Sequence, residues 1–106
     1  MNETTKIIKR IEENEEKLDK LSAIVRELER TLNNFDESQK MLEELNNYYG
    51  SKEWFDDKEA HEAGKIEKVK AGVLSEDAVW NLITDVKYLK EKMQEISNQK
   101  YNNIEH

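Results

Sequence analysis

The stretch IIKRIEENEEKLDKLSAIVRELERTL, residues 7–32, decides the fold of this chain. Its apolar side chains recur in alternating steps of four and three residues, and the same spacing continues as far as residue 49. The positions of this heptad stripe are Ile7, Ile11, Asn14, Leu18, Leu21, Val25, Leu28, Leu32, Phe35, Gln39, Leu42, Asn46 and Tyr49. Such a stripe is typical of a helix that packs one narrow face against other helices.

We expect the helix to occupy residues 1–49, because Thr4 or Thr5 can cap its start and Gly50 follows its end. The pair Asn33-Asn34 is its weakest point, since asparagine lowers helix propensity and Asn34 could cap a new helix. The stripe stays in phase across this pair, so the sequence favours one continuous helix. A break there would instead fold the N-terminal part back as a third member of a bundle.

The three glycines of the chain, Gly50, Gly64 and Gly72, all fall within residues 50–74 and predict a corner there. Ser51 can cap a short helix, and Gly64 can end it. Trp54 lies in this short helix, where we expect it to be largely buried against the start of the last helix.

Residues 75–100 predict a helix that returns antiparallel to the first one. Ser75 is placed to cap it, and Glu76 and Asp77 favour the positive end of the helix dipole. The apolar face of this helix consists of Val79, Leu82, Val86, Leu89, Met93 and Ile96. Residues 101–106 are expected to fray. The predicted fold class is therefore all-α: a single domain, residues 1–106, forming a helical hairpin that assembles into a bundle.

Two sequence blocks resemble a known family: YYGSKEWF at residues 48–55 and GVLSEDAV at residues 72–79. They are similar to an uncharacterised bacterial family known as domain of unknown function 4298, and the likeness covers most of the chain. The resemblance implies a small helical protein of bacterial origin. It implies no activity and assigns no functional residues, although it draws attention to the corner that the two blocks flank.

The charge of the chain argues against nucleic-acid binding. The formal net charge is −7, and residues 1–64, with 17 acidic and 10 basic residues, account for all of it. Residues 36–62 are the most acidic segment. Nucleic-acid binding needs a basic surface, so we expect no direct contact with DNA or RNA. A basic protein partner is compatible with this charge.

Composition also suggests where the protein works. The chain has no cysteine, which fits a reducing cytoplasm. Its N-terminus lacks the apolar core of a signal peptide, and no apolar run approaches the roughly 20 residues that cross a membrane. We therefore expect a cytoplasmic protein without membrane contact. No catalytic or phosphate-binding motif and no cofactor site is recognisable, so the sequence predicts no enzyme and no cofactor.

The corner offers a second candidate surface besides the stripe. Its residues are Tyr49, Trp54, Phe55, Asp57 and His61. The aromatic side chains could line a small pocket or simply close the end of a helix pair. The acidic residues around His61 could hold a divalent ion, but no second ligand group supports this, so we assign no metal site.

The N-terminal part of the stripe is the strongest functional signal. The last helix is too short to cover the whole of the first, which leaves Ile7, Ile11, Asn14, Leu18 and Leu21 without a partner in the chain. The first hypothesis is a non-enzymatic protein that self-associates through these residues, with a dimer favoured. The second is a regulator, of phage or mobile-element origin, that places its acidic face against a basic site. An enzyme with an acidic metal site is the weakest hypothesis.

Overall fold

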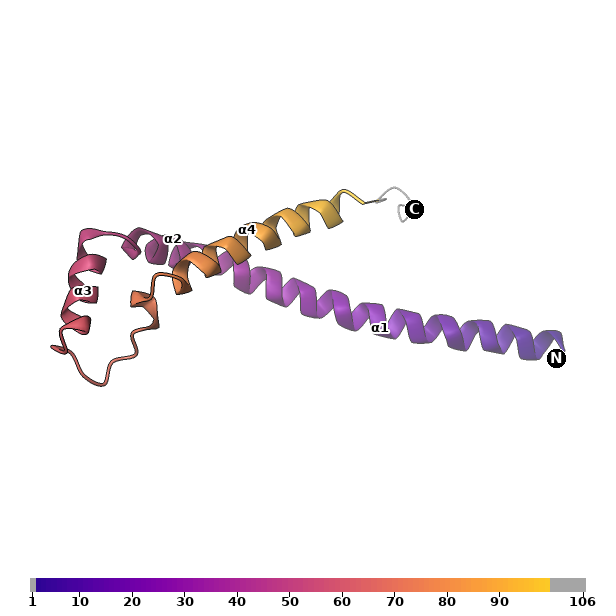
Figure 1. The fold of residues 1–106 in the computed structure, drawn as a ribbon. Coiled ribbons are helices and arrows are strands. Elements are labelled where there is room, and N and C mark those ends of the chain that lie inside the picture. The colour runs from indigo at the N-terminus through magenta and orange to yellow at the C-terminus, as the bar shows by residue number, and fades with distance from the viewer. Residues whose placement is uncertain (1, 100–106) are drawn as a thin grey trace. The chain divides into compact units, whose positions relative to one another are not determined.

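The computed structural model describes residues 2–99, and in them the chain is all-α, as the sequence predicts (Figure 1). The helices are α1 (Glu3–Glu37), α2 (Gln39–Tyr48), α3 (Lys52–Glu62) and α4 (Ala78–Ser97), with a short 3₁₀ helix, η1 (Gly72–Leu74), before α4. Within residues 2–99 no strand is present. No helix among the described residues is sufficiently long and apolar to cross a membrane. The predicted frayed tail, residues 101–106, lies outside the described residues.

The chain divides into two compact units, Met1–Lys40 and Met41–His106, where the sequence led us to expect a single domain. The first unit consists of α1 and the first residues of α2. The second contains the rest of α2 together with α3, η1 and α4. The antiparallel packing of the last helix against the first stays a prediction.

Helix α1 begins at Glu3 because the side chain of Asn2 caps it. The Oδ1 atom of Asn2 accepts a hydrogen bond from the backbone N–H of Thr5 at 2.8 Å. The cap is therefore Asn2, and the expectation of Thr4 or Thr5 is wrong. Asparagine is among the best N-cap residues, since its short side chain satisfies an N–H group that has no partner within the helix.

The predicted continuous helix over residues 1–49 is interrupted at Ser38, and the Asn33-Asn34 pair lies inside α1. The carbonyl oxygen of Phe35 accepts a hydrogen bond from Ser38 Oγ at 2.7 Å and another from Gln39 Nε2 at 3.1 Å. Side chains that bond nearby backbone groups compete with the helical pattern of hydrogen bonds. This competition accounts for the division into α1 and α2, at a place that helix propensity does not mark as weak.

Glycines in the left-handed backbone region end α2 and α3. Gly50, with φ of +79°, separates α2 from α3, and the hydroxyl of Ser51 then accepts the N–H of Trp54 at 3.2 Å. Gly64, with φ of +73°, follows α3. There the N–H of Lys65 donates to the carbonyl of Ala60, and the N–H of Gly64 donates to that of His61, which is a Schellman motif. The predicted short helix and both of its ends are thus present.

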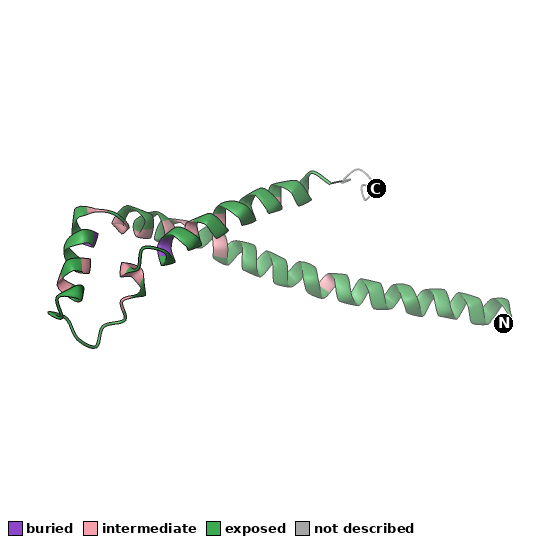
Figure 2. Cartoon of the chain, viewed as in Figure 1, coloured by how far each residue is buried: buried purple, intermediate pink, exposed green. Residues whose placement is uncertain are grey.

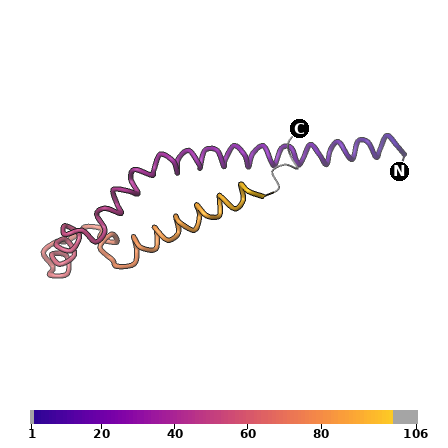
Figure 3. Tube along the Cα trace, turned by 90° about the horizontal axis from the view of Figure 1, so that it is seen from above, coloured from indigo at the N-terminus to yellow at the C-terminus, as the bar shows by residue number. Residues whose placement is uncertain are grey.

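Helix α4 begins at Ala78, after a 3₁₀ turn, whereas the sequence placed its start at residue 75. The N-cap position is therefore Asp77, whose side chain makes no capping bond, and the expectation of Ser75 there is wrong. The Ser75 hydroxyl does accept the N–H of Ala78, the first residue of the helix, at 3.0 Å. The chain from α3 to η1 winds into a small cluster before α4 leaves it (Figure 3). The buried core of the described residues lies in this cluster and the first turn of α4: Trp54 and Val79 are each 3% exposed.

Candidate functional surfaces

The stripe residues predicted to lack a partner in the chain all lie on α1, and their apolar members are exposed to solvent. The exposed fractions are 40% for Ile7, 57% for Ile11, 57% for Leu18 and 60% for Leu21. No residue of α1 is buried, and Figure 2 shows nearly the whole helix in the colour of exposed residues. The apolar stripe that the sequence singled out is therefore present on a helix that contributes nothing to a core in the described chain.

Asn14, the one polar member of the stripe between Ile7 and Leu32, lies at a shallow depression on α1. The depression is lined by Arg10, Ile11, Asn14, Glu15 and Leu18. The Nδ2 atom of Asn14 donates a hydrogen bond to the carbonyl of Arg10 at 2.8 Å, so the side chain folds back along its own helix. A second Nδ2 hydrogen and the carboxamide oxygen remain able to bond another group.

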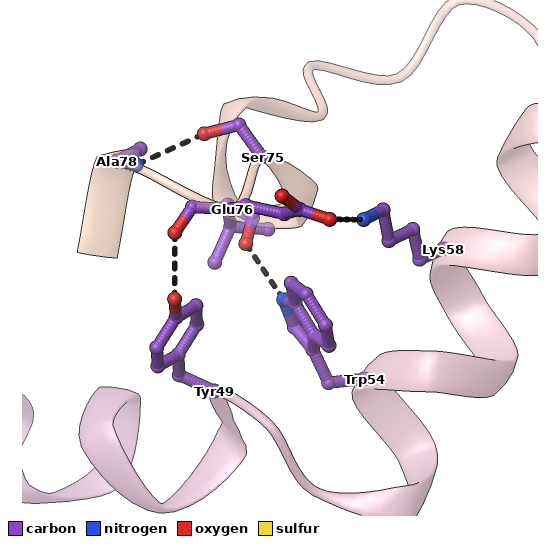
Figure 4. A network of polar contacts seen from close by, with 7 residues as sticks. Tyr49, Trp54, Lys58, Ser75, Glu76 and Ala78 are labelled. Carbon is purple, nitrogen blue, oxygen red and sulfur yellow. Dashed lines mark hydrogen bonds and ion pairs between the residues drawn. The ribbon is translucent and has the colours of Figure 1, made fainter. Parts of the chain in front are cut away.

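In the second unit, Trp54 holds α3 against the segment that leads into α4 (Figure 4). Its indole N–H donates to the carbonyl of Val73 at 2.9 Å. The rings of Tyr49 and Phe55 meet the indole edge-on, with centroids 5.2 and 4.9 Å away. A buried indole needs a partner for its N–H, and the Val73 carbonyl supplies it. Trp54 is therefore buried as the sequence predicts, while its neighbour Phe55 remains 59% exposed.

Glu76 makes the other contacts of this network, one through its backbone and one through its side chain. Its backbone carbonyl accepts the hydroxyl of Tyr49 at 2.6 Å, and its carboxylate accepts Lys58 Nζ at 2.9 Å. The Lys58 ammonium also lies 5.2 Å from the centre of the Trp54 ring, within the range of a cation–π interaction. The hydrogen bond to Lys58 lowers the pKa of the Glu76 carboxyl, and the same bond raises the pKa of Lys58. Tyr49, Trp54 and Lys58 thus join α2 and α3 to the start of α4.

Tyr48 and Asp57 form a separate pair between α2 and α3. The Tyr48 hydroxyl donates to Asp57 Oδ2 at 2.6 Å. Ionisation of the phenol would break this bond and place two negative charges together. The hydrogen bond to Asp57, aided by burial and by the negative charges of Asp57 and Glu53, raises the pKa of Tyr48 to about 12. Tyr48 therefore stays neutral at physiological pH and acts as a hydrogen-bond donor.

A cavity of about 200 Å³ opens beside this pair. Its walls combine side chains from the end of α2, from α3 and from the segment after it: Tyr48, Asp57, His61, Ile66, Val69, Lys70, Ala71, Val73 and Leu74. Ligand pockets for drug-sized molecules enclose about 300–1,000 Å³. This cavity is smaller, and it has room for little more than one apolar side chain or a comparably small group.

The acidic residues of α3 do not converge on a common point. Asp57 bonds Tyr48, and Asp56 forms an ion pair with Lys52 at 3.1 Å. Within residues 2–99, no three His, Cys, Asp or Glu side chains are grouped so that they could hold a metal ion. His61 lines the cavity with Asp57, but the other lining residues are Tyr48, Lys70 and apolar residues.

The structure thus separates the predicted corner residues into three groups. Asp57 and His61 line the cavity, Tyr49 and Trp54 belong to the polar network, and Phe55 contacts Trp54 from the outside. Sequence reasoning missed the contribution of Ile66 and other residues in the loop to the cavity wall. Their apolar character in an otherwise charged segment was the available signal. It also missed Glu76, which looked only like a favourable charge at a helix start.

The two sequence blocks that carry the family resemblance contact each other through this network. Tyr49 and Trp54 belong to the first block, and their partners Val73 and Glu76 belong to the second. A family model described as domain of unknown function (DUF4298) matches residues 11–96. No curated protein and no solved structure gave a match to the chain.

Proposed function

We propose that this chain, which belongs to the DUF4298 family, is a non-enzymatic interaction protein that self-associates through the apolar stripe of α1. One observation carries the proposal: α1 has 35 residues, and none of them is buried. Helices in proteins gain most of their stability from packing an apolar face rather than from helix propensity. A second copy of the stripe is the simplest surface to supply that packing, because two such stripes form a coiled coil.

The energy of burial determines how much of the stripe must take part. Its side chains are about half exposed, so covering each one gains roughly 1 kcal/mol. Ile7, Ile11, Leu18 and Leu21 on two chains would therefore contribute roughly 8 kcal/mol, against an association cost of about 4–15 kcal/mol. These four residues alone give a marginal dimer. The contact must extend along α1 to residues that are also exposed: Val25 (58%), Leu28 (55%) and Leu32 (41%).

The test compares one substitution on the stripe with a matched one off it. We expect Leu21→Asp to convert the dimer to a monomer, because a carboxylate cannot be buried there without a partner. Ala23→Asp places the same group on the opposite side of α1, two residues away, and should leave the dimer intact. Light scattering after size exclusion at tens of micromolar measures both masses. Equal masses for the two variants would show that the stripe does not form the interface.

A partner-binding regulator is the second candidate function. The exposed carboxylates of α3, which include Glu53, Glu59 and Glu62, favour it, since they form an acidic face that could occupy a basic site on another protein. Such a protein would be monomeric alone, and its complex would weaken with added salt. We place either form in the cytoplasm, because the chain has no cysteine.

A further inference from the structure

The charges beside the stripe of α1 are distributed unequally between its two edges. Heptad positions alternate along the stripe: Ile11, Leu18, Val25 and Leu32 form one set (a), and Ile7, Asn14, Leu21 and Leu28 form the other (d). The residues that precede the a set make up a basic flank with Arg10 and Lys17 as its charged members. Those that follow the d set, and Asp36 after the next stripe residue Phe35, make up an acidic flank with Glu15, Glu29 and Asp36 as its charged members. Flanking charges of this kind set the orientation of paired helices.

Arg10 and Glu15 are free to contact a partner. Residues five apart point about 140° away from each other around a helix, so the two side chains do not meet within one chain. Both are exposed, and among residues 2–99 neither takes part in an ion pair. In a parallel, in-register pair each Arg10 faces Glu15 of the other chain, and this contact occurs twice. An antiparallel pair would instead align the acidic flank with itself.

The depression at Asn14 is where a stripe side chain of a second copy would insert. In a coiled coil each stripe side chain inserts as a knob into a hole formed by four residues of the facing helix. In a parallel pair, a d residue of one helix enters a hole on the other helix. That hole is formed by the equivalent d residue, the residue directly after it (e), and the a residues before and after it. At Asn14 those residues are Ile11, Asn14, Glu15 and Leu18, and these four, with Arg10, line the depression.

The polar character of Asn14 favours the parallel arrangement, as the charged flanks do. In a parallel, in-register pair d residues face d residues, so Asn14 meets Asn14 of the second copy. Its free Nδ2 hydrogen can donate to the partner's carboxamide oxygen there. In an antiparallel pair d residues face a residues, which on α1 are all apolar between Ile11 and Leu32. A buried carboxamide without a hydrogen-bond partner is costly.

From the charged flanks and Asn14 together, we infer that α1 binds a second copy of this chain in parallel and in register, with the depression at Asn14 receiving a stripe side chain of that copy. This inference rests on the proposed self-association and adds the orientation of the two copies. The Asn14 pair fixes the register at some cost in stability, as polar stripe residues do in coiled coils.

Disulfide trapping distinguishes the two orientations, because the chain has no cysteine of its own. Single variants Asn14→Cys, Val25→Cys and Ala23→Cys are equilibrated in a glutathione redox buffer and analysed on non-reducing gels. A parallel, in-register pair predicts that Asn14→Cys and Val25→Cys each form a disulfide-linked dimer. Ala23→Cys, on the opposite side of the helix, measures random collision and should remain reduced.

Each other outcome has a defined meaning. Linkage that appears only when Asn14→Cys and Val25→Cys are mixed would indicate an antiparallel pair, which overturns the inference and leaves the proposed function standing. A dimeric mass without linkage at either position would also overturn the inference. A monomeric mass for all three variants and for the unmodified chain would overturn both.

Discussion

The two units of this chain are both helical, but they differ in what stabilises their helices. Unit 1 is formed almost entirely by α1, which has a side-chain cap and exposed ion pairs such as Lys20–Glu16 and no buried residue. In unit 2 a buried tryptophan and hydrogen bonds between distant residues hold short helices together. Exposed ion pairs contribute only about 0–1 kcal/mol each. Unit 2 therefore has its own tertiary structure, whereas α1 has no buried residue, which is why we propose a partner for unit 1.

The largest effect that separates the units should come from Trp54. We expect Trp54→Ala to destabilise unit 2 by about 3–5 kcal/mol, as truncations of buried aromatic residues do, and to remove the Val73 hydrogen bond as well. Chemical denaturation followed by far-ultraviolet circular dichroism would report it, because that helical signal needs neither of the two tryptophans.

The control for this measurement is Phe55→Ala. Phe55 is the next residue but is 59% exposed, so its removal should cost less than about 1 kcal/mol. A loss of similar size for both variants would mean that Trp54 does not hold the core of unit 2. The oligomeric state measured by light scattering should be the same for both variants as for the unmodified chain, because neither residue lies on α1.

A smaller effect concerns Tyr48 and the pH at which unit 2 weakens. The pKa of Tyr48 is raised from 10.0 to about 12, so the neutral, hydrogen-bonded phenol stabilises the folded state. That contribution is complete below pH 10 and is lost as the pH rises through about 12. We expect ultraviolet titration to find one high-pKa tyrosine that disappears in Tyr48→Phe. In Asp57→Asn it should return towards 10, and an unchanged titration there would refute the hydrogen bond as the cause.

The smallest expected effect is that of divalent ions on unit 2. An ion at a hundred times its dissociation constant would add about 2.7 kcal/mol to stability, which raises the melting temperature of a domain of this size by more than about 10 °C. We expect calcium, magnesium, manganese and zinc, each added after chelation, to shift it by no more than about 2 °C. A larger shift that Asp57→Asn or His61→Ala abolishes would reveal a site and change the functional interpretation.

Features that depend on neighbouring residues were predictable from the sequence. Ser51, Gly64 and Ser75 act at helix ends in ways that their local chemistry dictates, and the stripe of α1 follows from its spacing alone. The interruption at Ser38 was not predictable in this way. It depends on which side chain takes the Phe35 carbonyl, and no propensity scale ranks that competition.

Features that depend on residues distant in sequence were predictable only in outline. Trp54 was recognisable as a core residue, but its partner at Val73 is 19 positions away and offers a backbone carbonyl, which every residue has. The cavity wall requires the loop after α3 to turn at Lys68, whose φ of 60° is unusual for a residue with a side chain. Nothing in the sequence around Lys68 indicates that turn.

Sedimentation equilibrium of the unmodified chain, over a dilution series down from tens of micromolar, tests the central claim most directly. A single chain has a mass of 12.6 kDa. Self-association through α1 predicts twice this mass at the highest concentrations, falling towards the single-chain value on dilution, while the helical circular dichroism signal decreases in parallel. A mass of 12.6 kDa at every concentration, with a constant and fully helical spectrum, would contradict it.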